Sequence, residues 1–516
     1  MKKKYILLAV LMIFAASSCK KDFINLNPVD SLSPDTFFQT DDELEQAVAA
    51  AYAPLRDLLI NDYHTSETRS DNTHYIPNPN NRGTATVYQE NVSDWNNDAN
   101  NDYVNAVYYH CYTGISRANI VIGRLPKAAK ASAAGKARAD GQAKFLRAWN
   151  YFKLVRLFGG VPLYLTEVTK ADEAFKDRST VDQVYAQIIA DAKDAVDELL
   201  PPAKFPQTGE ATKGSATMLL ADVYVTLKRY KEAEDLLKTL PAMNYSLFDN
   251  YSDAFLPANK NGKESIFEVQ YLQGTAAGTQ PNTVIFQFLP KTTNTSLITG
   301  PAFPSTTTGS GWNIPTFDLL ADYEPNDKRL DASIGIAEGT YDASFVMTIS
   351  AVKSPVGYVP TPGTSYTPFI KKYIHPPFVA TTNSNDDWPI YRYSEALLLL
   401  AEAQNEQGES PLTALNTVRN RAGLSSVTET DQSKLRNIIM HERRIELAFE
   451  NKRFHDLQRI SNGLTIMQAY AVKAKQNFTN LVANAFDIQA YKFLFPIPLP
   501  ERNLNPGMKQ NPGYAF

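Results

Sequence analysis

Few residues of this 516-residue chain are spaced for catalysis. The segment HERRI starts at His441 as a zinc-protease helix does, but Ile445 stands where the second imidazole ligand is needed. In GEATKGS, Lys213 precedes Gly214, whereas a phosphate-binding loop requires the lysine after the glycine. A distant carboxylate pair of the glycosidase type has no local spacing by which it could be recognised. We therefore predict a protein that is not an enzyme and that holds neither a metal nor a cofactor.

Aromatic side chains offer a different chemistry, the binding of sugars. A sugar ring has an apolar C–H face and a rim of hydroxyls, so it is recognised by a flat aromatic ring with a few hydrogen-bonding groups beside it. The chain has 4 tryptophans. Trp149 shares a helical stripe with Phe145 and Phe152, which predicts a core position, and Trp388 precedes a proline at the expected start of a helix, which predicts packing.

The other two tryptophans lie in polar sequence. Trp95 is surrounded by Asn and Asp in VSDWNNDANNDY, and Trp312 follows Gly, Ser and Thr in TTTGSGWNIP. Such residues favour turns and loops over apolar burial. We predict that Trp95 and Trp312 are exposed stacking platforms for a ligand.

Polar residues close to these tryptophans could supply the hydrogen bonds of the site. Asn100 and Asn101 follow Trp95 by five and six residues, and either amide could bond two adjacent hydroxyls. Asp71 and Arg82 in SDNTHYIPNPNNRG could add charge-assisted bonds, although a solvated loop position explains these two equally well. The predicted ligand-binding set is thus Trp95, Trp312, Asn100, Asn101, Asp71 and Arg82.

The N-terminus has the pattern of a secretory signal. Three lysines precede an apolar run from Tyr5 to Ala16 and the small residues Ser17 and Ser18, so we predict a signal peptide over residues 1–18. Small residues before Cys19 resemble a bacterial lipoprotein signal, in which this cysteine would be acylated and anchor the protein. The usual lipobox has leucine where Ala16 stands.

Composition narrows the class of protein further. There are 2 cysteines, so a chain whose Cys19 is lipidated has no disulfide and must be held together by its core. With 51 Lys and Arg against 55 Asp and Glu the formal net charge is −4. Nucleic-acid binding is not expected, because it favours a strongly basic face.

Helical periodicity divides the chain into regions. It runs from about 41 to 240 and again from 388 to about 460, whereas residues 242–387 are rich in Pro, Gly, Ser and Thr with short β-type runs. The tail 493–516 has too many prolines for a helix. We predict a mainly α fold in which an irregular, loop-rich region with short strands is mounted on a helical scaffold and carries the ligand site.

Two stretches of the scaffold fit the tetratricopeptide pattern. Six residues fall at its fixed offsets, and a second unit repeats the theme with one extra residue. Small residues let the two helices of a hairpin approach closely, so we predict helical hairpins at both places. The matching residues are Leu220, Ala221, Tyr224, Tyr230, Ala233 and Leu237 in the first unit and Leu400, Ala401, Ala414 and Val418 in the second.

Seven segments in order resemble the signatures of the SusD/RagB family of Bacteroidetes outer-membrane lipoproteins. They span essentially the mature chain 19–516 and are RAWNYFKLVRLFGGVPLY, TKGSATMLLADVYVTLKRYKEAED, YEPNDKRLDASI, YRYSEALLLLAEAQNEQG, LNTVRNRAGL, HERRIELAFENKRFHDLQR and PIPLPERNLNPGMKQNPGY. The resemblance implies a helical protein with tetratricopeptide-like units that captures nutrients as the lid of a SusC-like TonB-dependent transporter. Many members bind oligosaccharides, and Trp95 and Trp312 match by context the two loops that supply aromatic platforms in those members.

The resemblance also bears on location and leaves the cargo open. Lys20, Lys21 and Asp22 after Cys19 resemble the surface-export signals of Bacteroidetes lipoproteins, which implies a lipid anchor at the outer face of the outer membrane. A glycan is the expected cargo. A peptide-binding member of the same family and a tetratricopeptide scaffold that binds only proteins are the alternatives.

Overall fold

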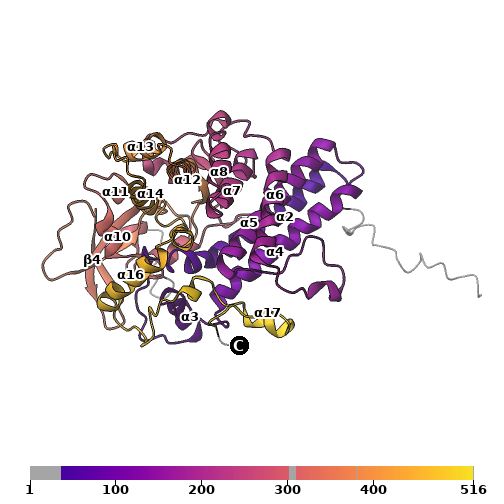
Figure 1. The fold of residues 1–516 in the computed structure, drawn as a ribbon. Coiled ribbons are helices and arrows are strands. Elements are labelled where there is room, and N and C mark those ends of the chain that lie inside the picture. The colour runs from indigo at the N-terminus through magenta and orange to yellow at the C-terminus, as the bar shows by residue number, and fades with distance from the viewer. Residues whose placement is uncertain (1–36, 301–309, 381, 515–516) are drawn as a thin grey trace, which may run out of the picture.

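The computed structural model describes residues 37–300, 310–380 and 382–514 (Figure 1). The predicted signal peptide 1–18 and Cys19 lie outside these residues. Within the described part, no helix combines the length and the apolar character that crossing a membrane requires.

Four long helices form one side of the molecule (Figure 1). They are α2 (Asp41–Ser66), α4 (Asp102–Arg124), α5 (Ala133–Phe158) and α6 (Val181–Glu198), and α2 packs on α4, α4 on α5 and α5 on α6. The first of them starts at the expected residue. Thr40 accepts a hydrogen bond from the Glu43 amide while the Glu43 side chain bonds back to the Thr40 amide, which satisfies two helix-end donors.

The predicted helical hairpins are present. Helices α7 (Lys213–Thr226) and α8 (Tyr230–Leu237) pack together, and α12 (Tyr393–Glu406) packs on α8, α13 (Leu412–Arg421) and α14 (Gln432–Glu446). Ala221 and Ala233 are fully buried, as expected for the small residues of a close helix pair. The mainly α scaffold with tetratricopeptide-like hairpins is therefore confirmed.

The middle region holds short antiparallel sheets. One has the strand order β5-β4-β6, made of β4 (Ile334–Tyr341), β5 (Met347–Lys353) and β6 (Ser365–Ile370). In the other two sheets, β1 (Thr73–His74) pairs with β3 (Ile314–Pro315), and β2 (Ser265–Val269) pairs with β7 (Trp388–Arg392). Both of these pairs join the middle region to the scaffold sequence on either side of it.

The remaining elements are short or lie near the C-terminus. The α-helices are α3 (Thr84–Ser93), α9 (Ser296–Thr299), α10 (Phe317–Asp322), α11 (Arg329–Ser333), α15 (Arg453–Arg459), α16 (Gly463–Asn477) and α17 (Leu499–Leu504). The 3-10 turns are η2 (Leu125–Lys127), η3 (Ala171–Ala174), η4 (Leu240–Met243), η5 (Tyr251–Phe255), η6 (Pro257–Asn259), η7 (Val284–Phe288) and η8 (Ala490–Phe493).

Three boundary predictions need correction. Trp388 is packed as expected, with its ring 5.0 Å from that of Tyr373, but it begins strand β7 and the helix starts only at Tyr393. Helix α16 extends the helical region beyond residue 460. The tail is not free of helix, because the proline of α17 stands in the first turn, where a missing N–H costs nothing.

A network of buried charges joins the second hairpin unit to the middle region. The Glu446 carboxylate contacts Arg329 at 3.2 Å, Arg392 at 3.1 Å and Arg421 at 2.5 Å. Burial alone would raise the pKa of Glu446, but the three guanidinium groups hold it well below its ordinary value. Asp456, paired with Arg443 and Arg459, likewise has its pKa lowered to about 2 against the effect of burial.

This network predicts how stability depends on pH. A carboxylate whose pKa is depressed in the folded state stabilises it above the unfolded-state pKa, and that contribution is lost as the pH falls toward the folded value. Glu446→Gln removes one negative charge from among three buried guanidinium groups, so at pH 7 it should lower the free energy of unfolding by about 3–5 kcal/mol. The difference in unfolding free energy between the variant and wild type should shrink below about pH 4. At that pH Glu446 of the unfolded wild type becomes protonated, so the wild type loses the stability that its folded carboxylate supplies.

Urea denaturation at a series of pH values measures this effect. Glu409→Gln, at an exposed position of the turn after α12, is the matched control and should follow the wild-type curve. A Glu446→Gln variant as stable as wild type at pH 7 would show that the network contributes nothing.

Candidate functional site

The structure places Trp95 in the core, where it is 1% exposed. The Arg69 guanidinium lies 4.0 Å from its ring centroid, and the rings of Phe493 and Phe454 lie at 5.1 and 5.8 Å. A ring enclosed in this way has no face for a sugar. The prediction that Trp95 is an exposed platform is therefore wrong for this structure.

The polar neighbours that suggested a loop are themselves buried partners. Asp94 accepts hydrogen bonds from Tyr75 at 2.8 Å and pairs with His74 at 3.0 Å, while Asn97 accepts one from Arg69 at 2.9 Å. Trp95 follows the end of α3 with a φ of +60°, which turns the chain sharply. Side chains at such a turn need not be solvated, because internal partners can satisfy their polar groups.

Two more predicted site residues serve the fold. Asp71 is 3% exposed, and its two oxygens accept from the Arg453 guanidinium at 2.8 and 2.9 Å. Burial would raise the pKa of Asp71, but Arg444 and Arg453 hold it well below its ordinary value. Asn101 caps α4 by accepting from the amides of Tyr103 and Val104. Neither side chain is free for a ligand, which corrects both predictions.

Arg82 and Asn100 are closer to solvent. Arg82 pairs at 2.5 Å with Glu90, and 43% of the arginine side chain is exposed. Asn100 is exposed, and its amide N–H donates to the Asp98 carboxylate at 2.9 Å. That Arg82 and Asn100 bind a ligand stays a prediction, and among the described residues no contact joins either of them to Trp312.

Trp312 lies beside strand β3 and is 7% exposed. Its backbone N–H donates to Gln287 at 3.0 Å, and its ring centroid is 6.2 Å from that of Tyr75. Gly311 has a φ of +89°, and a Cβ at this position would come within 3.3 Å of Ile76 and of Lys291. The close approach of these segments buries Trp312, so the prediction that it is an exposed platform is also wrong for this structure.

Loop 76–83, which carries Arg82, adjoins the segment of Trp312 and is held by polar contacts. The Lys291 amine donates to the Asn78 amide oxygen at 3.0 Å and to the Ser344 carbonyl at 2.7 Å, and burial lowers its pKa. Asn80 donates to the Ser344 hydroxyl at 2.5 Å. Loop 76–83 is thereby tied to the turn between β4 and β5, two segments that no sequence spacing relates.

Two exposed aromatic rings and one half-buried ring form a contiguous group, which we term the aromatic cluster: Phe317, Tyr366 and Tyr358. Phe317 is 52% and Tyr366 is 37% exposed. The Tyr366 ring lies 5.5 Å from Phe317 and 5.2 Å from Tyr358, and the Tyr358 hydroxyl donates to Glu338 at 2.5 Å. Rings that touch one another and still face solvent can stack on a sugar.

The local sequence contains a signal for one of these rings. Thr316 caps α10 by accepting from the Leu319 amide at 3.1 Å, and Leu319 is fully buried. Residues two apart on a helix point to different sides, so a buried Leu319 directs Phe317 outward. Tyr358 and Tyr366 come together through the β5–β6 connection, for which the sequence offered no comparable clue.

Hydrogen-bonding groups surround the aromatic cluster. Glu338 accepts from the amide and the hydroxyl of Thr361, both at 2.9 Å, and from Lys353 at 2.7 Å. These bonds, with that from Lys353 first, lower the pKa of Glu338 to about 2. An aromatic surface edged by charge-assisted bonds is suited to binding a polar ligand. Among the described residues, no group of His, Cys, Asp or Glu side chains is arranged to hold a metal ion.

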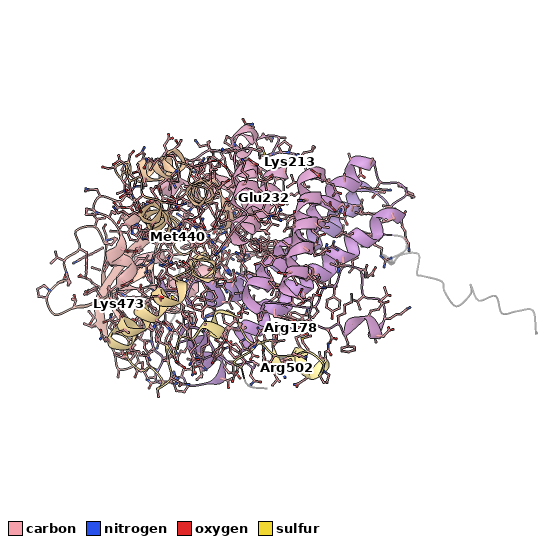
Figure 2. The ribbon with its side chains drawn as sticks, in the orientation of Figure 1. Arg178, Lys213, Glu232, Met440, Lys473 and Arg502 are labelled. Carbon is pink, nitrogen blue, oxygen red and sulfur yellow. The ribbon has the colours of Figure 1, made fainter. Side chains whose placement is uncertain are left out.

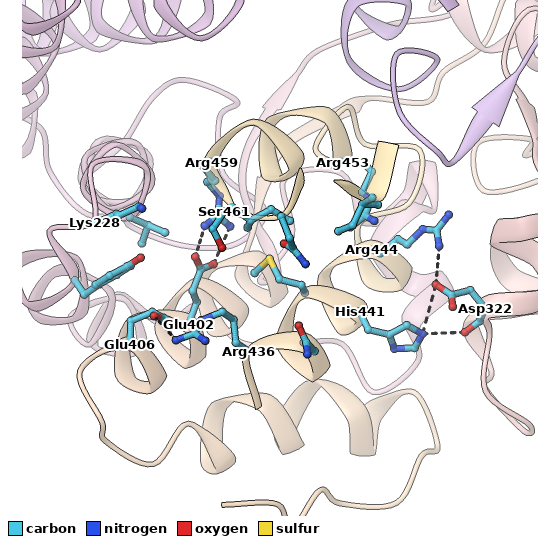
Figure 3. Close-up of a pocket in the computed structure, with 17 residues that line it drawn as sticks. Lys228, Asp322, Glu402, Glu406, Arg436, His441, Arg444, Arg453, Arg459 and Ser461 are labelled. Atoms are coloured by element: carbon cyan, nitrogen blue, oxygen red, sulfur yellow. Dashed lines mark hydrogen bonds and ion pairs between the residues drawn. The ribbon is translucent and has the colours of Figure 1, made fainter. Parts of the chain in front are cut away.

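A separate cleft of about 410 Å³ opens between α8, α12 and α14 (Figure 3). A hollow of about 470 Å³ shares Asp322, Arg444, Arg453 and Ile466 with it. Met440 lines the cleft and Lys473 on α16 lines the hollow, and both residues are labelled in Figure 2. The walls of the cleft carry many more charged side chains than the aromatic cluster does.

Comparisons with known proteins find similar sequences along nearly the whole chain. A family model described as the SusD family matches residues 263–514, and one described as "Starch-binding associating with outer membrane" matches residues 22–225. SusD-like protein P2 of Formosa agariphila is 29% identical over 99% of this chain and 100% of its own length.

Solved structures share the fold. A SusD homolog from Bacteroides thetaiotaomicron superposes with a TM-score of 0.76 at 21% identity, over 93% of this chain and 98% of its own. A laminarin-binding SusD-like protein superposes with a TM-score of 0.71 at 25% identity, over 92% of this chain and 99% of its own.

The burial of Trp95 predicts a structural role. Trp95→Ala removes a large ring from the contact with Arg69 and two phenylalanines, so it should lower the free energy of unfolding by about 3–5 kcal/mol. Tyr109→Ala is the matched control, since Tyr109 is 63% exposed, and should change it by less than about 0.5 kcal/mol. Chemical denaturation measures both, and a fully stable Trp95→Ala variant would refute the core assignment.

Proposed function

Because the chain belongs to the SusD/RagB family, we propose that it binds an oligosaccharide at the cell surface as the lid of a SusC-like TonB-dependent transporter. Glycan binding is supported by the relatives, among them one titled as laminarin-binding and a family model described as starch-binding. The transporter partnership is the finer part of the proposal, and it rests on the family's mode of action.

The proposed location follows from the same family. One matching model describes proteins that associate with the outer membrane. In our proposal the signal peptide is removed, acylated Cys19 supplies the anchor, and Lys20, Lys21 and Asp22 direct the protein to the outer face. The lipid then keeps the protein close to its transporter.

The observation that carries glycan binding is the accessibility of the aromatic cluster. Within the aromatic cluster, Phe317 and Tyr366 are largely exposed and their rings contact each other. In the proposed site they stack on sugar rings, while the Lys353 amine, on a side chain that is 35% exposed, donates to the hydroxyls. Arg82 and Asn100 are further candidates from the sequence, and a Trp312→Ala variant tests whether the side of the molecule at Trp312 contributes to binding.

The chain is proposed to act by binding, without catalysis. A lid that passes its cargo onward should bind it only moderately, with dissociation constants in the ~μM to mM range, or roughly −8 to −4 kcal/mol. Exposed rings are suited to this, since a sugar that stacks on a surface remains partly solvated and can leave quickly.

Isothermal titration of wild-type protein with laminari- and malto-oligosaccharides and with peptides tests the proposal. Phe317→Ala and Tyr366→Ala should each weaken oligosaccharide binding about tenfold or more, because stacking contacts are hot spots of a binding surface. Both variants should melt like wild type, since the rings are exposed. Val359→Ala, at a 74% exposed residue, is the control and should bind normally.

Trp312→Ala is compared at equal folded fraction. Binding lost only in this variant would move the glycan site to the Trp312 side and contradict the aromatic cluster. Binding of peptides in place of every oligosaccharide would contradict the glycan assignment and support a peptide-binding member of the family.

A further inference from the structure

The cleft between α8, α12 and α14 has charged walls whose acidic members are already neutralised. Arg459 contacts Glu402 at 2.7 Å, and Arg436 contacts Glu406 at 2.6 Å. These pairs are drawn as dashed lines in Figure 3. Carboxylates held in bidentate pairs have little capacity left to attract a cation or to accept from a ligand.

Asp322, the third acidic residue that lines the cleft, is also paired with an arginine. Asp322 is contacted by Arg444 at 2.8 Å, and its backbone carbonyl pairs with His441 at 2.9 Å (Figure 3). In the adjoining hollow, Asp71 is paired with Arg453 and Arg444, while Asp318 is paired with Lys473. The acidic groups of both spaces are thus engaged by protein cations.

Hydrogen-bond donors remain free around the cleft. Five basic side chains line it against three acidic ones, in a chain whose net charge is −4. Among the described residues, no side-chain partner contacts the exposed Lys228 amine or the exposed Asn437 amide. Exposed Ser461 and Asn462 complete the rim. A ligand rich in acceptor oxygens fits this set of donors.

The cleft also offers apolar surface for a ring. Tyr230, Met440 and Ile466 line the cleft together with Lys228. In the adjoining hollow, the Tyr470 hydroxyl is buried without a hydrogen-bond partner while its residue, 5% exposed, lines the space.

We propose that this cleft is a second saccharide site, selective for a sugar residue that carries an anionic oxygen group, either a carboxylate or a sulfate ester. Lys228 supplies the charge, Asn437 bonds ring hydroxyls, and Tyr230 faces the apolar side of the ring. A volume of about 410 Å³ is within the range of small-ligand pockets. The site is separate from the aromatic cluster and does not depend on it for binding.

Isothermal titration with sodium glucuronate, glucose 6-sulfate and uncharged glucose at low and high salt tests this inference. Wild type should bind at least one of the charged sugars at least fivefold more tightly than glucose, and the preference should fall as salt screens the charge. Lys228→Gln should weaken that binding at least fivefold. It removes the charge while keeping an unbranched side chain at a residue with a φ of +59°.

Asn437→Ala, at an exposed helical position, is a second variant and should also weaken binding of the charged sugar. Lys193→Gln on the exposed side of α6 has the same charge change and should bind like wild type. Neutral oligosaccharides that bind the aromatic cluster should bind Lys228→Gln normally, so failure of one site is distinguishable from failure of the other.

Several results would overturn the inference. Equal binding of charged and uncharged sugars, or undiminished binding by Lys228→Gln and Asn437→Ala, would exclude an anion-selective site here. Tighter binding of an acidic peptide than of either charged sugar would assign the cleft to a protein partner.

Discussion

Buried charged side chains link the end of α2 to the α14–α15 segment, and the rest of the structure depends on this link. The Glu67 carboxylate, fully buried, accepts from the backbone amides of Phe449 and Asn451 at 3.1 and 3.0 Å. Asp71 binds Arg453 and Arg444 across more than 370 positions of sequence. A buried ion left without its partner is strongly destabilising, so these contacts determine how the α2 end and the α14–α15 segment fit together.

The same link positions the ligand-facing side. Asn72 accepts from the Thr316 amide at 2.9 Å, and the Thr316 hydroxyl donates to the Asp71 carbonyl at 3.0 Å. Thr316 caps α10, which presents Phe317 to solvent on one side and Asp318 to the charged hollow on the other. The Phe317 end of the aromatic cluster and one wall of the charged hollow are therefore held by the segment that Asp71 fixes. In our proposals, the cleft adds charge selectivity to the ring stacking that the aromatic cluster provides.

Local pattern predicted the scaffold well and the site poorly. Helix starts such as Thr40 and small-residue contacts such as Ala221 follow from spacing within one segment. Trp95 was misplaced because polar neighbours normally indicate a loop, whereas here Asp94 and Asn97 are paired inside the protein with residues 19 to 28 positions away. Short strands such as β7 depend on a partner more than a hundred residues distant. The aromatic cluster unites α10 with the β5–β6 connection, so its rings could not be grouped before the fold was known.

Hydrogen–deuterium exchange of an Asp71→Asn variant tests most directly the claim that buried charge holds the ligand-facing side. The asparagine side chain carries no charge and cannot neutralise Arg444 and Arg453. The backbone amides of residues 72–76 and 312–322 should therefore exchange at least tenfold faster than in wild type. Helix α6 (Val181–Glu198), remote from this link in the order of packed helices, should exchange as before. Unchanged protection of residues 72–76 and 312–322 would show that the charge link does not position them and would contradict the account.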